Sequence, residues 1–241
     1  MKLSDEQKAA LRADFKKMTA SQKLGYIFDY YKFPIIIAIL VVVFVVSTAR
    51  RMAAQKEPIL YLGAVNVSWS DDMEAVFTED FVRDRALDPN KNEVYVYYDL
   101  NLSDDASANS NGYSYASNMK LMAAAYGDQL DILLMNREAY DLLSRSAYLA
   151  DLSGLLDPEL AEAVSDQLTY NDVIVEDNSL EALPDEDGEA LIVTERSMNG
   201  ILISELRALQ GAGFDEDVYL GVGAGIARPD MVKAYIQYLA K

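Results

Sequence analysis

The stretch from Phe33 to Ala49 holds 17 residues without a charge, and it constrains the fold more than any other part of the chain. Lys32 precedes it and Arg50-Arg51 follow it. This length is at the short end for a helix that crosses a bilayer, but flanking Lys and Arg side chains can reach the interface and lengthen the usable segment. A run of Ile and Val without polar positions is a poor amphipathic core helix. The sequence therefore predicts a transmembrane helix that contacts the lipid bilayer through Phe33 to Ala49.

A cleaved signal peptide is the main alternative, because Ser47-Thr48-Ala49 has the small-x-small pattern of a cleavage site. The 32 residues before the apolar run are much longer than a short basic leader. Arg50-Arg51 is also more typical of the flank that stops a membrane segment. We therefore expect an uncleaved signal anchor, and with no cysteine in the chain a lipid anchor on an N-terminal Cys is excluded.

The charges on the two sides of the span differ in sign. Residues 1–56 carry 10 basic and 4 acidic side chains, whereas residues 57–241 carry 11 basic and 35 acidic, a net charge of −24. Basic residues favour the cytoplasmic side. We expect a single-pass bacterial cell-membrane protein with a cytoplasmic N-terminus and an extracytoplasmic C-terminal domain.

Four segments follow from this reading: a cytoplasmic basic amphipathic tail, residues 1–32; a transmembrane signal anchor, residues 33–49; a linker, residues 50–58; and an extracytoplasmic α/β domain, residues 59–241. Leu11, Phe15 and Met18 form an apolar stripe in the tail. That stripe fits either a helix lying on the anionic inner leaflet or a solvated helix whose charges only fix the topology.

Composition removes several classes of function from the outer domain. Its negative charge opposes binding to nucleic acid, so no nucleic acid is expected as a partner. The chain has no His and no Cys, which excludes Ser-His-Asp and Cys-His nucleophiles and zinc sites with nitrogen or sulfur ligands. We expect no cofactor, no metal and no catalytic residue. An enzyme with paired carboxylates is the alternative, but no acidic pair stands out.

The hydrophobic pattern of the outer domain alternates between the periods of strands and helices. Strands are predicted at residues 59–67, 93–102 and 130–135, and helices at residues 70–87, 115–126 and 136–146. Alternation of this kind predicts an α/β fold with a mainly parallel sheet.

Two longer stretches are similar to a known family. The run AAAYGDQLDILLMNREAYDLLSRSAYLADLSGLL, residues 123–156, and the run VYLGVGAGIARPDMVKAYIQYL, residues 218–239, resemble segments of extracytoplasmic, periplasmic-type solute-binding proteins. The segment Ser197 to Ile203 is similar to the one that leads into their final lobe crossing. The resemblance implies a reduced periplasmic-binding-protein-like domain, since the 183 residues from Ile59 on are fewer than two full lobes need.

Two functions follow from the resemblance and the short length. The first is a membrane-tethered extracytoplasmic binding or sensing module for a small solute or a peptide. The alternative is a non-catalytic scaffold or interaction subunit that uses the same fold against a membrane or envelope protein.

Candidate ligand-binding residues follow from fold geometry, because ligands of parallel α/β sheets lie beyond the carboxyl ends of the strands. These candidates are Ser68, Trp69, Asp99, Asn136 and Arg137. Trp69, the only tryptophan, could stack on a ligand or pack as a core or hinge aromatic. Arg137 could pair with a carboxylate or phosphate, or lie on a helix as a solvated side chain.

Three further patterns favour structural explanations. Gly221-x-Gly223-x-Gly225 lacks the spacing of a dinucleotide-binding loop. The acidic segment 183–189 fits a hairpin loop between residues 173–176 and 190–194 better than a calcium site. The tyrosines at positions 95, 97 and 98 are expected to be packing and edge residues of a strand.

Overall fold

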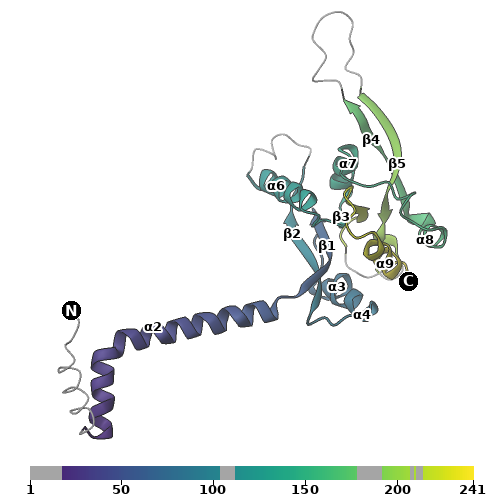
Figure 1. The fold of residues 1–241 in the computed structure, drawn as a ribbon. Helices are drawn as coiled ribbons and strands as arrows, with labels where there is room; N and C mark the ends of the chain where they lie inside the picture. The colour runs from purple at the N-terminus through teal and green to yellow at the C-terminus, as the bar shows by residue number, and fades with distance from the viewer. Residues whose placement is uncertain (1–17, 104–111, 178–191, 207–208, 210–213) are drawn as a thin grey trace, which may run out of the picture. The chain divides into compact units, whose positions relative to one another are not determined.

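A computed structural model gives the fold of the chain, and it describes residues 18–103, 112–177, 192–206, 209 and 214–241 (Figure 1). The chain separates into two compact units, Met1–Gln55 and Lys56–Lys241. Each unit is described by itself. Residues 1–17 of the predicted amphipathic tail and the acidic segment 183–189 lie outside the described residues.

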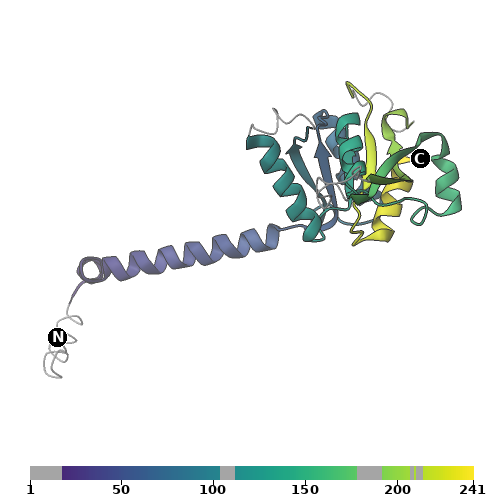
Figure 2. The ribbon, with the colours of Figure 1, turned by 90° about the horizontal axis from the view of Figure 1, so that it is seen from above.

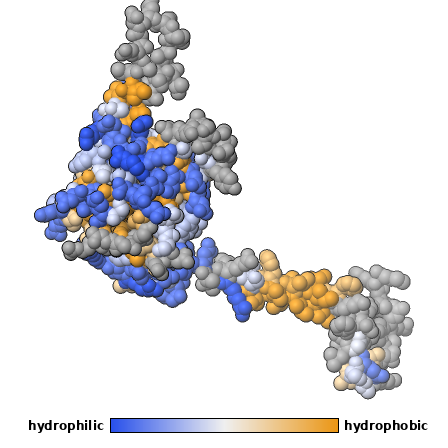
Figure 3. Space-filling view, turned by 180° about the vertical axis from the view of Figure 1, so that it is seen from behind, coloured by the Kyte–Doolittle hydropathy of each residue, from blue (hydrophilic) through white to orange (hydrophobic). Residues whose placement is uncertain are grey.

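The first unit contains one long helix, α2, Ala20–Ala54. Its segment Phe33–Arg50 is long and apolar enough to cross a membrane, and its side chains are not covered by the rest of the protein. In Figure 3 these residues form a continuous hydrophobic stretch. The predicted span Phe33 to Ala49 lies within this helix. By length and composition the helix fits a membrane anchor or a signal sequence, and it continues through residues 50–54, where the sequence suggested a linker.

The second unit is built on a six-stranded sheet in the order β2-β1-β3-β6-β5-β4 (Figure 1). Its strands are β1, Glu57–Val65; β2, Asn92–Leu100; β3, Ile132–Met135; β4, Leu168–Asp177; β5, Ile192–Leu202; and β6, Tyr219–Val222. Strand β1 pairs in parallel with both β2 and β3, whereas the pairs β3–β6, β6–β5 and β5–β4 are antiparallel. The α/β class is confirmed. The expectation of a mainly parallel sheet is wrong for half of it.

Part of the antiparallel half has a local cause. Strands β4 and β5 pair directly as a hairpin, and the two strands of a hairpin run in opposite directions. The helical crossovers that produce parallel pairing occur only earlier in the chain, through α3 and α4 between β1 and β2 and through α6 between β2 and β3. The predicted hairpin arms at residues 173–176 and 190–194 correspond to these two strands over the described residues.

Helices cover both faces of the sheet, which gives three layers (Figure 2). One face packs against α3, Asp71–Phe77, α4, Glu79–Asp84, α8, Pro158–Ala163, and α9, Pro229–Leu239. The other face packs against α6, Gly112–Tyr126, and α7, Arg137–Arg145. Strand β3 lies between them, and all four of its residues are buried. Its alternate side chains enter the two separate cores.

The single helix predicted over residues 70–87 is divided in two. Helix α3 ends at Phe77 and α4 begins at Glu79, because Thr78 has φ −124° and ψ −86°, outside the helical region. The apolar spacing that suggested one helix is still used: Phe77 and Phe81 are both fully buried. The break changes the direction of the backbone but keeps both rings in the core.

We expect a fragment from Lys56 onward to fold without α2. The described contacts group residues 56–241 as one compact unit with its own cores, and the exposed apolar side chains of residues 33–46 contribute nothing to them. Purified fragment should be soluble and give a single cooperative transition in chemical denaturation. An aggregated product, or one without cooperative unfolding, would contradict this division of the chain.

Candidate functional site

The carboxyl ends of β1, β2 and β3 meet, as the candidate site requires, but their polar side chains bond to one another. The Asn66 amide group donates to the Leu102 carbonyl oxygen at 2.6 Å and accepts from the Leu102 amide at 2.9 Å. The Asn136 side chain accepts from the Ala139 amide at 3.0 Å, which caps α7, and lies 3.4 Å from Asn66 Nδ2. These groups therefore hold the three strand ends together instead of facing an open cleft.

Asn66 can do this because its backbone adopts φ 56°, in the left-handed region that asparagine tolerates. Its side chain then turns toward the neighbouring strand end and occupies both hydrogen-bonding groups of Leu102. The predicted residue Asn136 is the N-cap of α7, a position that Ser, Thr and Asp also favour. Both asparagines have structural tasks at the strand exits.

Ser68 is exposed and lines a small hollow beyond the end of β1. The hollow has a volume of about 60 Å3, and its other described lining residues include Phe214, Asp215 and Glu216. Sites for small molecules usually have volumes of roughly 300 to 1,000 Å3. The hollow at Ser68 has room for a water molecule or a small ion, but it is too small for a sugar or an amino acid.

Trp69 is half-buried and packs against other aromatic rings. Its ring centroid lies 5.1 Å from that of Phe77 and 6.0 Å from that of Tyr98. These contacts link the loop after β1 to the core under α3 and to the edge strand β2. The geometry matches the packing alternative for Trp69, and the indole does not line the hollow at Ser68.

Asp99 lies where β2 departs from regular pairing. Its φ is 57°, and the register between β1 and β2 shifts from Gly63–Tyr97 to Val65–Leu100 at this point. Asp99 is exposed, and its carbonyl oxygen accepts from the Asn101 side chain at 3.4 Å. The residue forms an irregularity in the strand. It is separate from the group formed by Asn66 and Asn136.

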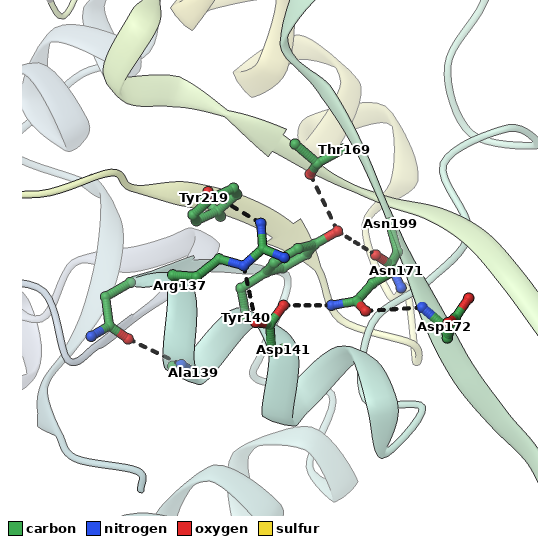
Figure 4. Close-up of polar contacts among 10 residues, drawn as sticks. Arg137, Ala139, Tyr140, Asp141, Thr169, Asn171, Asp172, Asn199 and Tyr219 are labelled. Carbon is green, nitrogen blue, oxygen red and sulfur yellow. Dashed lines mark hydrogen bonds and ion pairs between the residues drawn. The ribbon is translucent and has the colours of Figure 1, made fainter. Parts of the chain in front are cut away.

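Arg137 lies on the first turn of α7, above two stacked tyrosines (Figure 4). Its guanidinium carbon is 5.8 Å from the Tyr140 ring centroid and 5.5 Å from that of Tyr219, and the two rings stack 4.8 Å apart. Arg137 Nε also donates to Asp141 Oδ2 at 2.9 Å. The Tyr219 hydroxyl and the Asp141 carboxylate raise the pKa of Arg137. The guanidinium is thus engaged by its own fold, although more than half of the side chain is exposed.

A buried polar network lies beneath Arg137 (Figure 4). The Tyr140 hydroxyl donates to Asn199 Oδ1 at 2.8 Å and accepts from Thr169 Oγ1 at 3.2 Å. Asn199 Nδ2 in turn donates to Ser144 Oγ at 2.6 Å. Tyr140, Asn199 and Ser144 are fully buried, and burial raises the pKa of the Tyr140 hydroxyl. The network joins α7 to the β4–β5 hairpin with its polar atoms satisfied.

Sequence reasoning did not find this network, since Tyr140 and Asn199 are 59 positions apart. Gly200 was the one local signal. A Cβ at Gly200 would lie 2.6 Å from Tyr140 Cε2, so the residue must lack a side chain for the tyrosine to pack there. Nothing in the sequence names the tyrosine as its neighbour.

A larger hollow lies along the outer edge of β2, and none of the predicted site residues lines it. Its volume is about 310 Å3, and its walls come from the strand and from α3 and α4. Its lining includes Glu74, Thr78, Val82, Val96 and Tyr98. The sequence predicted Tyr98 as a packing or edge residue of a strand. It did not predict that β2 lies at the edge of the sheet, nor that α3 and α4 form a second wall beside that strand. We call this hollow, with all its lining residues, the edge groove.

Comparison of the chain with protein-family models, curated proteins and solved structures gives no match. The resemblance to solute-binding proteins therefore stays a prediction from the sequence. The function has to be inferred from the geometry of the domain.

We expect Tyr140→Phe to lower the free energy of unfolding by about 1 to 3 kcal/mol, because the change leaves the buried Asn199 oxygen without its donor. Denaturant unfolding of the fragment from Lys56 measures this difference. Tyr126→Phe is the matched control, since Tyr126 is 84% exposed, and it should change stability by less than about 0.5 kcal/mol. Equal effects of the two substitutions would show that the network contributes nothing.

Proposed function

We propose that this chain is a membrane-tethered, non-catalytic interaction module whose α/β domain binds a protein partner on the extracytoplasmic side. One observation carries the proposal: the strand exits, where a solute would bind in a fold of this class, are closed by the protein's own hydrogen bonds. The space left there, about 60 Å3, is too small for the solutes expected of a binding protein.

The apolar helix supports a membrane location for the proposed module. An apolar helix whose side chains are uncovered over Phe33–Arg50 suits a bilayer, and seven basic against four acidic side chains in residues 1–32 favour a cytoplasmic N-terminus. A domain of net charge −24 is repelled by anionic lipid, which would keep its surface available to other proteins. Solute capture, the function that the family resemblance implies, is favoured less because it needs an open cleft.

The proposed orientation predicts a simple protection pattern. Protease added to intact cells or spheroplasts should remove a tag placed after Lys241 and spare a tag placed before Met1, because only the outer domain is accessible. Lysed cells, in which both tags should be cleaved, are the control. Loss of the N-terminal tag with retention of the C-terminal tag would reverse the topology and move the partner to the cytoplasm.

The proposed function predicts a specific crosslink and no solute response. Photo-crosslinking residues placed singly at Thr78, Ala116 and Ala163 sample α3–α4, α6 and α8 of the full chain in intact cells. We expect one of these positions to give a discrete adduct with another protein, while the other two stay uncrosslinked. Purified protein alone, irradiated in the same way, identifies adducts between copies of the chain.

The matching solute experiment is a thermal-shift panel of sugars, amino acids and short neutral peptides. A ligand of the folded state at a hundredfold excess over its dissociation constant stabilises that state by about 2.7 kcal/mol, which a midpoint shift detects. We expect no shift from sugars or amino acids. A selective shift from one of them, without any adduct in cells, would replace partner binding by solute capture.

A further inference from the structure

Strand β2 is an edge strand in the sheet formed by the described residues, where it pairs only with β1. The Glu57 amide donates to the Lys91 carbonyl oxygen at 2.7 Å, so the backbone groups of Lys91 face β1. Along a strand the backbone groups of successive residues face opposite sides. Those of Glu93 and Tyr95 therefore also face β1, and those of Val94 and Val96 face outward. The outward row can accept one more strand.

The side chains beside this row complete a binding channel. Val94 and Val96 point to the face of the sheet that α3 and α4 cover, where Val94 belongs to the same core cluster as the buried Val82 of α4. The edge groove runs between them and the helices, with Glu74 and Thr78 on the helical wall. An extended segment paired with β2 would place alternate side chains over this groove. Main-chain bonds would supply affinity and the groove would supply selectivity.

One end of the channel is already closed. Lys120 Nζ, from α6, donates to the Tyr98 carbonyl oxygen at 3.2 Å, and the Tyr98 hydroxyl donates to Glu74 Oε1 at 2.8 Å. These bonds fix Tyr98 across the end of the groove. The open part of the edge therefore extends from Asn92 to Val96. Burial and the Glu74 carboxylate raise the pKa of Tyr98, so its hydroxyl keeps its proton at neutral pH.

The opposite edge of the sheet, β4, is less suited to this role. Both edge strands pair with their neighbours through two register shifts, at Pro58–Leu60 and Gly63–Val65 beside β2 and at Thr169–Tyr170 and Ile174–Glu176 beside β4, so regularity does not separate the two edges. No helix of the described residues forms a wall along the outer half of β4 as α3 and α4 do along β2. The groove between Val94, Val96 and the helices makes β2 the better template.

Charge decides what kind of segment fits. The groove is lined by Glu74, Glu79 and Glu93 against one cation, Lys56. Glu79 is paired with Arg83 at 2.7 Å, and Lys120 lies at the closed end of the groove, so the negative charge that a partner meets is mainly that of the whole domain, −24. A second copy of this chain would bring another domain of net charge −24 to the same edge, which like-charge repulsion opposes. A basic partner is favoured instead.

We infer that β2 is the docking strand of this module, and that its ligand is an extended basic segment of a partner protein that adds to the sheet as a seventh strand beside Val94 and Val96. This inference rests on the proposed function and names the site and the chemistry of the partner. If a partner in cells is crosslinked only through Ala116 or Ala163, the result supports an interaction module but contradicts β2 as its docking strand.

The direct test uses the full chain in nanodiscs of neutral phosphatidylcholine, so that a cationic probe does not bind the lipid. The probe is a blocked, fluorescent nine-residue peptide of alternating Lys and Val, which matches the length of β2. We expect saturable binding in fluorescence anisotropy that weakens as salt increases. The control peptide has the same charge but Pro in place of each Val, so it cannot form a strand, and it should bind at least about tenfold more weakly.

Two variants locate the site. Val96→Pro removes one outward N–H group from β2, and Thr78→Arg places a cation in the groove without touching the strand; each should weaken probe binding at least about tenfold. The matched control, Val175→Pro on the opposite edge strand, should leave it unchanged. Circular dichroism checks that each variant folds. If Val96→Pro does not fold, the result for Thr78→Arg decides the outcome. Equal binding of the two peptides, or loss of binding only in Val175→Pro, would overturn the inference.

Discussion

Strand β3 must be apolar on both faces, because helices cover both sides of the sheet at its centre, so the polar residues next to it, Asp131 and Asn136, lie just beyond its ends. At one end Asp131 is fully buried, accepts from the Tyr61 amide at 2.9 Å and lies 3.2 Å from Arg228 Nη1. At the other end Asn136 caps α7 and lies against Asn66. The ends of β3 are thus where the domain ties its strands together.

The same arrangement directs function away from the usual place. In an α/β sheet the exits of the parallel strands are the expected ligand site, yet here Asn66 and Asn136 use that position to satisfy backbone groups of the fold. Among the described residues, the outward backbone groups of Val94 and Val96 on β2 have no strand partner, and they lie beside a groove of about 310 Å3. A domain with closed exits and an open edge suits recognition of another chain.

Local pattern was enough to predict the long apolar helix, the α/β class and most strand positions. It could not predict that the sheet becomes antiparallel after β3, because that depends on β6 entering beside β3 and on the β4–β5 hairpin continuing the sheet. Of the candidate residues, Asn136 lies at the predicted strand exit, where it meets Asn66, but as a cap. Trp69 packs against Phe77, Arg137 lies over the Tyr219 ring, and Asp99 lies at a register shift between β1 and β2. A local sequence pattern reveals none of these three environments.

Amide hydrogen exchange of the free protein distinguishes closed strand exits and an open sheet edge from the reverse arrangement, because it reports on both regions in one experiment. We expect slow exchange for the Asn66, Leu102 and Ala139 amides, because they are hydrogen-bonded within the fold. We expect fast exchange for the outward amides of Val94 and Val96. The opposite pattern, with rapid exchange at the exits and protection along β2, would contradict these expectations. In that case the strand exits would be the open site and the edge the closed one.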